Sequence, residues 1–369
     1  MKRTSFRTVA APSVAALVLG LALTGCAAGN EKTADAASSD GPKLSGTLNG
    51  AGSSAQEAAQ GAWTSGFQTT NPDVTVNYDP VGSGGGREQF LAGGVDFAGS
   101  DSYLTDEELT KSKETCKGGT AIEVPNYVSP IALAFNLEGV DQLQLSAKTT
   151  SDIFSGKITT WDDPAIKAEN PDAKLPGDRI VPVHRADESG TTANFTQWLS
   201  GAGEGAWTAE PGGVWPTKGG EGAQGTSGVI EAIKNGKGTI GYADESQVGD
   251  LSTASIKVGD AYQAPTADAA SKAVDVSKKV DGRDKSDIAI DIDRTTTEAG
   301  TYPLVLASYV IACPTYADKA KAELVKGYLT YLLGQSGQAA AAKTAGSAPL
   351  STEFSKDSLA VVDTITTKG

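Results

Sequence analysis

The chain has 369 residues, of which 39% are hydrophobic and 21% are charged, and its formal net charge is −14. This length is enough for two domains of ordinary size. The acidic balance argues against nucleic acid or an anionic membrane surface as a partner, so any anion site must depend on local donors.

Residues 1–25 have the pattern of an export signal. Three basic residues precede an apolar run that ends at Leu23-Thr24-Gly25-Cys26 and is too short for a comfortable membrane span. This ending is similar to a bacterial lipobox, which implies cleavage before Cys26 and lipid attachment to its sulfur. A signal without lipidation, followed by a chance cysteine, is the alternative. Residues 26–43 are polar and lack periodicity, which predicts a flexible tether with a reach of roughly 20–25 Å.

Two further cysteines, Cys116 and Cys313, lie far apart in the sequence. In an exported protein an even pair predicts a disulfide, with two buried free thiols as the alternative. The sequence has one histidine and no closely spaced cysteines, so we expect no metal site, and no motif calls for a cofactor.

The mature chain opens with two units in which a strand, a Gly/Ser turn and a helix follow one another. Residues 44–49 predict a strand, 50–54 (GAGSS) a turn, and the apolar spacing that follows a helix ended by Asn71-Pro72. Residues 74–78 alternate as a second strand, and 81–87 (VGSGGGR) lead into a short helix. Both helix starts offer unpaired N–H groups to an anion.

A third strand is predicted at residues 95–101, ending in Asp101. This carboxylate either faces the same cleft or caps a turn, which is the commoner role. Residues 121–137 are apolar, β-prone and interrupted by two prolines, which fits a strand crossing between two lobes, and residues 302–313 are a candidate return crossing. Residues 250–300 are polar, and we expect them to be irregular.

The strongest candidate for an anion site is residues 184–192 (HRADESGTT). They follow an apolar run and precede an amphipathic segment, so Ser189, Gly190 and Thr191 are predicted at a helix N-terminus, where N–H groups and the dipole favour an anion. Arg185 adds a guanidinium fork suited to oxyanions, and Asp187 is close enough to hold it. An ordinary capped helix with a surface ion pair is the alternative.

Enzyme motifs are absent from the sequence. Gly-x-Ser-x-Gly surrounds none of the candidate serines, and His184 is the sole histidine and a poor relay for Ser189. The phosphate-binding loop Gly-x4-Gly-Lys-Ser/Thr is also missing. We therefore expect a binding protein, not an enzyme.

Four motifs together resemble one family, the phosphate-binding protein of the bacterial phosphate ABC transporter (PstS). They are residues 48–54, 81–86, 96–101 and 185–191, and the similarity extends over nearly the whole mature chain, including 156–163 and 238–242. The resemblance implies an α/β, two-lobe periplasmic-binding-protein fold of type II, with the ligand cleft between lobes joined by crossing strands. We expect lobe I at 44–127 and 304–369, and lobe II at 128–303.

The resemblance also implies how the ligand is held. Backbone donors would come from the segment 53–55, and hydroxyl donors from two serines. The helix start at 189–191 would donate to phosphate beside the arginine, and Asp101 would accept a hydrogen bond from its protonated oxygen. The complete set is Ser53, Ser54, Ala55, Ser83, Asp101, Arg185, Ser189, Gly190 and Thr191. The chain departs from the family at Ser54, where threonine is common, and at Ala55, where a bulky aromatic can stand.

These features predict a monomeric, lipid-anchored protein on the extracytoplasmic face of the cell membrane, which captures inorganic phosphate and delivers it to the permease subunits of an ABC transporter. A buried carboxylate in an anion site is costly unless the ligand brings a proton, so Asp101 favours hydrogen phosphate over sulfate. A protein for another oxyanion, such as sulfate or molybdate, is the first alternative. A secreted phosphatase or esterase and a purely structural lipoprotein are further ones.

Overall fold

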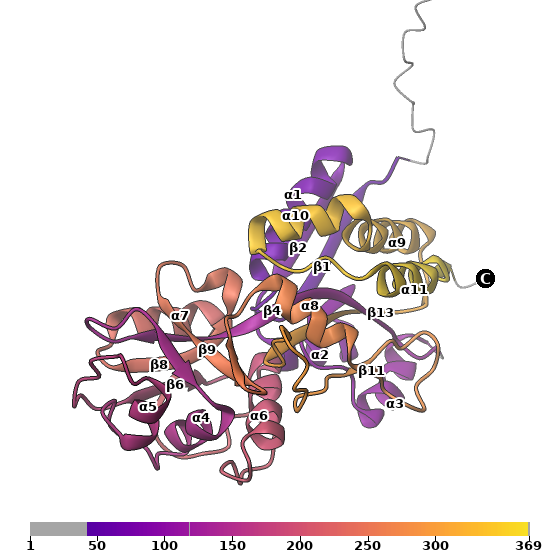
Figure 1. The fold of residues 1–369 in the computed structure, drawn as a ribbon. Helices are drawn as coiled ribbons and strands as arrows, with labels where there is room; N and C mark the ends of the chain where they lie inside the picture. The colour runs from indigo at the N-terminus through magenta and orange to yellow at the C-terminus, as the bar shows by residue number, and fades with distance from the viewer. Residues whose placement is uncertain (1–42, 118, 368–369) are drawn as a thin grey trace, which may run out of the picture. The chain divides into compact units, whose positions relative to one another are not determined.

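The computed structural model describes residues 43–117 and 119–367 (Figure 1). The predicted export signal, the lipidation site at Cys26 and residues 26–42 of the tether lie outside the described residues. Within the described part, no helix is both long and apolar enough to cross a membrane.

The central element is a mixed sheet of eleven strands, most of them short. Its strands are β1 Gly46–Gly52, β2 Val74–Asp79, β3 Phe97–Ser100, β4 Ile122–Asn136, β5 Leu143–Leu145, β6 Val181–Arg185, β7 Glu221–Ala223, β8 Thr239–Asp244, β9 Ser252–Val258, β10 Ala261–Gln263 and β13 Val305–Ala312. Two small pairs lie apart from it: β11 Lys278–Lys279 with β12 Ile290–Asp291, and β14 Thr315–Tyr316 with β15 Thr366–Thr367.

Helices follow most of the strands and cover the sheet. They are α1 Glu57–Thr70, α2 Ser83–Leu91, α3 Asp106–Thr115, α4 Ala147–Phe154, α5 Pro164–Glu169, α6 Gly190–Ala202, α7 Gly225–Asn235, α8 Ala267–Asp275, α9 Lys319–Leu333, α10 Gln335–Ala345 and α11 Thr352–Asp363, with a 3-10 turn, η1, at Glu245–Gln247. Side chains cap several of them; Ser351, for example, accepts from the Phe354 amide at the start of α11.

Strand β4 connects the two ends of the sheet, whose main path runs β2-β1-β3-β13-β4-β8-β6-β7. Its first part pairs with β13, and its last residues pair with β8 and β9. Val124 belongs to one hydrophobic core and Leu133 to another, because the strand passes from one to the other. Figure 1 shows β4 between the group that contains α1, α9 and α10 and the group that contains α4, α5 and α7.

The segment before and along β13 makes the same passage in the opposite direction. Leu304 packs in the core that contains Leu133, whereas Val310 packs in the core that contains Val124. Both segments expected to cross are therefore β-structured and contribute to two cores. The lobe boundaries at 127/128 and 303/304 remain predictions.

The expectation that residues 250–300 are irregular is wrong. Strands β9 and β10, helix α8 and the β11–β12 pair occupy this stretch. In β9 the buried side chains Ala254, Ile256 and Val258 alternate with more exposed ones, the pattern of a strand with one face on the core. The alternation is short and its apolar residues are few, so the polar composition of the segment hides it.

The structure joins Cys116, at the end of α3, to Cys313, just after β13. Their Cα atoms are 5.2 Å apart and both side chains are buried. The bridge spans 197 residues in sequence and ties α3 to the sheet within one core cluster.

Candidate functional site

Three segments at one edge of the sheet form what we call the first wall: residues 53–55, Ser83 and Asp101. They follow β1, begin α2 and follow β3, respectively. Because β1 and β3 are parallel neighbours, their carboxyl ends meet at the same edge. Hydrogen bonds from two backbone amides fix the arrangement: the Ser53 amide donates to the Gly99 carbonyl at 2.9 Å, and the Asp101 amide donates to Ser83 Oγ at 3.1 Å.

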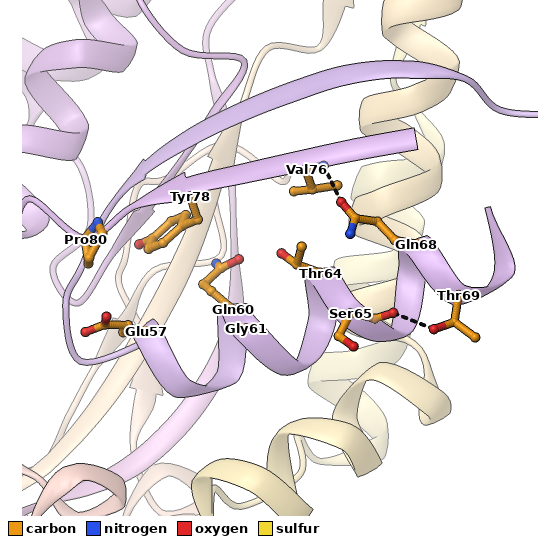
Figure 2. Close-up of a pocket in the computed structure, with 10 residues that line it drawn as sticks. All are labelled: Glu57, Gln60, Gly61, Thr64, Ser65, Gln68, Thr69, Val76, Tyr78 and Pro80. Atoms are coloured by element: carbon orange, nitrogen blue, oxygen red, sulfur yellow. Dashed lines mark hydrogen bonds between the residues drawn. The ribbon is translucent and has the colours of Figure 1, made fainter. Parts of the chain in front are cut away.

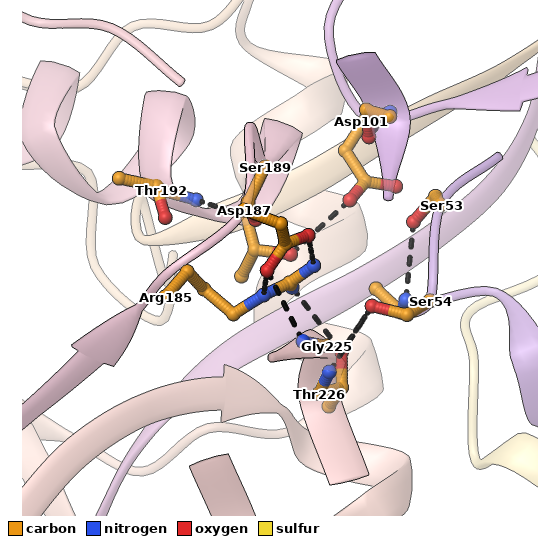
Figure 3. A network of polar contacts seen from close by, with 12 residues as sticks. Ser53, Ser54, Asp101, Arg185, Asp187, Ser189, Thr192, Gly225 and Thr226 are labelled. Carbon is orange, nitrogen blue, oxygen red and sulfur yellow. Dashed lines mark hydrogen bonds and ion pairs between the residues drawn. The ribbon is translucent and has the colours of Figure 1, made fainter. Parts of the chain in front are cut away.

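Two further segments form the second wall: residues 185–191 and 225–226. Arg185 ends β6, and residues 189–191 cap and begin α6. Gly225 and Thr226 begin α7, which follows β7, and β7 is a parallel neighbour of β6. The starts of α6 and α7 therefore lie at one end of these strands and face the same space (Figure 3).

The two walls are in direct contact, and the contacts come from buried polar groups (Figure 3). Thr191 Oγ1 donates to Asp101 Oδ2 at 3.2 Å, and the Thr226 amide donates to Ser54 Oγ at 3.1 Å. Just beyond the second wall, Asn194 Nδ2 on α6 donates to the Asp101 carbonyl at 2.7 Å. Gly190 makes this approach feasible, because a Cβ at that position would lie 2.6 Å from Ser83 Oγ and 2.7 Å from Asp101 Cβ.

Arg185 is held by a bidentate ion pair. Its side chain is 2% exposed, and its Nε donates to Asp187 Oδ1 at 2.8 Å while Nη2 donates to Asp187 Oδ2. Burial opposes ionisation of Asp187, but the hydrogen bonds and charge of Arg185 keep the pKa of that carboxyl below its ordinary value. The pair stays charged, so the guanidinium is fixed in orientation before any ligand arrives.

Asp101 is in the opposite electrostatic situation. Burial raises the pKa of Asp101 above its ordinary value, although hydrogen bonds from Ser53 and Ser308 and the charge of Arg185 act against it. Ser308 on β13 donates to Asp101 Oδ1 at 2.7 Å. A carboxyl held this way favours a partner that carries a proton.

The helix start at α6 supplies amides to the space between the walls. Ser189 caps the helix by accepting from the Thr192 amide at 3.2 Å, and its own amide donates to the Gly213 carbonyl at 2.9 Å. The amides of Gly190 and Thr191 precede the first intrahelical bond. In the first wall, the Ser53 amide is likewise paired, and the Ala55 amide donates to Ser53 Oγ at 3.1 Å. The backbone donors thus differ in how readily they can serve an anion.

Comparison with known proteins assigns the chain to a family. Residues 37–336 match the model described as the PBP superfamily domain. Phosphate-binding protein PstS 3 of Mycobacterium tuberculosis strain H37Rv is 38% identical over 299 residues, which are 79% of this chain and 80% of the relative. The chain belongs to the PstS family of phosphate-binding proteins.

Further relatives agree with this assignment. Phosphate-binding protein PstS 2 of the same organism is 34% identical and covers 94% of this chain and 95% of its own length. A solved high-affinity periplasmic phosphate-binding protein (PfluDING) with bound phosphate has a TM-score of 0.68 at 25% identity, over 84% of this chain and 92% of that one. The fold is thus the two-lobe α/β fold of the periplasmic binding proteins.

All nine residues that the family resemblance implies are buried and lie on the two walls. Sequence reasoning assigned no role to four neighbours: Asn194, Thr226, Gln247 and Ser308. Gln247, in η1, donates to the Ser54 carbonyl at 2.8 Å from a distant part of the sequence. The available signals were slight: a hydroxyl inside the apolar strand β13 for Ser308, and a Gly-Thr-Ser-Gly helix start for Thr226.

A cavity of about 330 Å³ adjoins the site. Asp101, Ser189 and Gly190 form one side of it, and Arg87 and Arg294 contribute to its lining. In the described part of the chain, no group of three or more His, Cys, Asp or Glu side chains is arranged to hold a metal ion.

A larger groove, of about 610 Å³, lies between α1 and β2 (Figure 2). Gln60, Thr64, Gln68 and Tyr78 are typical of its lining, which also includes the acidic Glu57. No lysine or arginine is among the ten residues that line it in the described chain. The charged residue among these ten, Glu57 at the start of α1, is acidic and would repel an anion, so the chemistry favours the space between the two walls.

Proposed function

We propose that this chain captures inorganic phosphate outside the cytoplasmic membrane and delivers it to the permease of an ABC transporter. The observation that carries the proposal is the meeting of Arg185, the α6 start and Asp101 in one buried space between two walls. Its relatives named phosphate-binding protein PstS support the same ligand.

Each part of the site suits hydrogen phosphate. A guanidinium has five N–H groups, and Asp187 occupies two of those on Arg185, so others remain for oxyanion oxygens. The amides of Gly190 and Thr191 and the hydroxyls of Ser54 and Ser83 add neutral donors. Asp101 accepts a hydrogen bond from the protonated oxygen that hydrogen phosphate has near neutral pH and sulfate lacks, so sulfate would leave two acceptors facing each other.

Binding is proposed to be coupled to closure. The first and second walls come from segments far apart in the chain, and a ligand bonded to both stabilises the arrangement in which they touch. The closed form is then the state that a permease recognises.

The chain is proposed to bind without turnover, as a monomer that needs no cofactor. Its one histidine, His184, stacks on Trp215 with ring centroids 4.8 Å apart, and its Nδ1 contacts the Arg185 carbonyl at 3.0 Å. This placement favours a structural role for His184, which supports the end of β6, over a role as a general base. A lipid on Cys26 and the segment that follows would keep the protein near the membrane on the extracytoplasmic side.

The test is a calorimetric titration of the mature, phosphate-stripped protein with phosphate, sulfate and molybdate at neutral pH. We expect one-to-one phosphate binding and no response to the other two. Saturable sulfate or molybdate binding without phosphate binding would overturn the ligand, and hydrolysis of a chromogenic phosphate ester would overturn the binding-only function.

The contribution of Arg185 is tested by Arg185→Met. Hydrogen bonds to charged groups contribute about 1.5–3 kcal/mol each, so losing them should weaken phosphate binding by at least about 100-fold. Arg179→Met is the matched control, because Arg179 is exposed and lies just before the same strand. Equal affinities of the two variants would contradict the role of Arg185.

A further inference from the structure

Thr226, at the start of α7, makes an unusually complete set of contacts for a residue outside the family motifs. It is 1% exposed. Its amide donates to Ser54 Oγ at 3.1 Å, and its hydroxyl lies 3.0 Å from the same oxygen. Arg185 Nη1 donates to Thr226 Oγ1 at 3.5 Å. Figure 3 shows Thr226 between Arg185 and Ser54.

Counting donors and acceptors gives these contacts a direction. A guanidinium N–H can only donate, so Thr226 Oγ1 is the acceptor toward Arg185. The contact between the Thr226 and Ser54 hydroxyls allows either oxygen to be the donor, and our proposal takes the arrangement in which Thr226 donates to Ser54 Oγ. In this arrangement Ser54 Oγ accepts twice, from the amide and from the hydroxyl of Thr226, which fills both of its lone pairs.

With Thr226 as the donor, the hydroxyl hydrogen of Ser54 has no acceptor on Thr226 and turns away from it. Ser54 is then a donor toward the space between the walls. Hydrogen bonds in such a chain also polarise one another, which strengthens the last donor.

We propose that Thr226 is a positioning residue for phosphate. Its hydroxyl accepts a hydrogen bond from Arg185 and donates one to Ser54 Oγ, so that the Ser54 hydroxyl donates to the ligand. This rests on the proposed function, since it assumes that phosphate occupies the space between the walls. Ser54 belongs to the first wall and Thr226 to the second, so the chain of hydrogen bonds forms when the walls meet. It couples closure to the donor strength of the site.

The experiment is a double-mutant cycle read by phosphate titration. Thr226→Val removes the hydroxyl and keeps the amide, and we expect it to weaken phosphate binding about 5–10-fold, the typical effect of one hydrogen bond. Thr226→Ser keeps the hydroxyl and should stay within about 2-fold of the wild type. Ser54→Ala should weaken binding on its own, and Ser54→Ala with Thr226→Val should be no weaker than Ser54→Ala.

Ser227→Ala is the control, because Ser227 is the next residue of α7 and is exposed. If Thr226→Val does not fold, Thr226→Ala replaces it in the same cycle. If Thr226→Val weakened phosphate binding by the same factor in the wild-type and in the Ser54→Ala background, its role would be merely structural and the proposal would be overturned. Unchanged phosphate affinity of Thr226→Val would overturn it as well. A wild type that fails to bind phosphate would overturn the proposed function itself, which the same titrations distinguish.

Discussion

Replacing Asp101 by asparagine is expected to weaken the preference for phosphate over sulfate. The side chain is 3% exposed and accepts hydrogen bonds from Ser308 and Thr191. An ionised carboxylate can accept but not donate, so it has no bond to offer a fully deprotonated oxyanion. Asparagine has nearly the same shape and adds two N–H donors, one of which can face a sulfate oxygen.

The magnitude follows from the groups that the wild type would leave unpaired. A buried polar group without a partner costs about 1–3 kcal/mol, and a charged group costs more. A sulfate oxygen facing Asp101 leaves two such acceptors, so we take about 3–4 kcal/mol as the penalty. At about 1.4 kcal/mol per tenfold, Asp101→Asn should raise sulfate affinity by about 10²–10³. Phosphate affinity should change less, since the amide oxygen can still accept a hydrogen bond from the protonated oxygen of phosphate.

The assay is a competition titration of phosphate against sulfate at fixed pH and ionic strength. Glu123→Gln is a matched control, because Glu123 is also a fully buried carboxylate with a raised pKa, but it accepts from the Leu104 amide instead of facing the proposed ligand. Asp101→Asn should also preserve the fold, since burial opposes the charge that it removes. An unchanged ratio of phosphate to sulfate affinity in a folded Asp101→Asn variant would refute the assigned role.

Two further predictions concern stability. Burial raises the pKa of Asp244 to about 7, and Asp244 Oδ2 lacks a hydrogen-bond partner within the described chain. Because the folded value exceeds the unfolded one, the stabilisation is complete at low pH and is lost as pH rises through about 7. At about pH 8 we expect the free energy of unfolding of Asp244→Asn to exceed that of the wild type by up to about 4 kcal/mol, and at about pH 4 we expect no such difference, as measured by urea unfolding. Unfolding free energies that depend on pH in the same way in both proteins would contradict this. Reducing the Cys116–Cys313 bridge should cost about 5 kcal/mol by the chain-entropy account, measured by urea unfolding with and without reductant. Phosphate affinity should survive reduction, because neither cysteine touches the site, and its loss would place the bridge in the binding mechanism.

The parts of the site that sequence could predict are those encoded by local pattern. A strand, a polar turn and a helix follow one another in the segments around Ser83 and around Ser189, and each helix start is visible from neighbouring residues alone. Asp187 is two residues from Arg185, so their ion pair was also predictable, and the structure confirms it.

The parts that sequence could not predict depend on contacts across the fold. Ser308 reaches Asp101 over 207 residues, and Thr226 reaches Ser54 over 172. Neither lies in a motif, and a hydroxyl in an apolar strand or a helix start has many ordinary roles. The β9 strand was missed for a related reason: besides the short neighbouring strand β10, its partners are β4 and β5, which lie far away in sequence and contribute to the core that its alternating side chains face.

The pairing of backbone amides was equally hidden. A helix or loop start predicts donors, but only the packed structure reveals that the Ser189 amide is taken by Gly213 and the Ser53 amide by Gly99. Among the described residues, the amides of Gly190 and Thr191 therefore suit an anion better than those two.

A crystal structure of the phosphate-loaded protein tests the central claim most directly. Our account predicts one phosphate between the two walls, with oxygens within hydrogen-bond distance of Arg185, the Gly190 and Thr191 amides and the Ser54 hydroxyl, and one oxygen facing Asp101. Phosphate bound elsewhere, such as in the adjoining cavity beside Arg294, with Asp101 not in contact with it, would contradict the account.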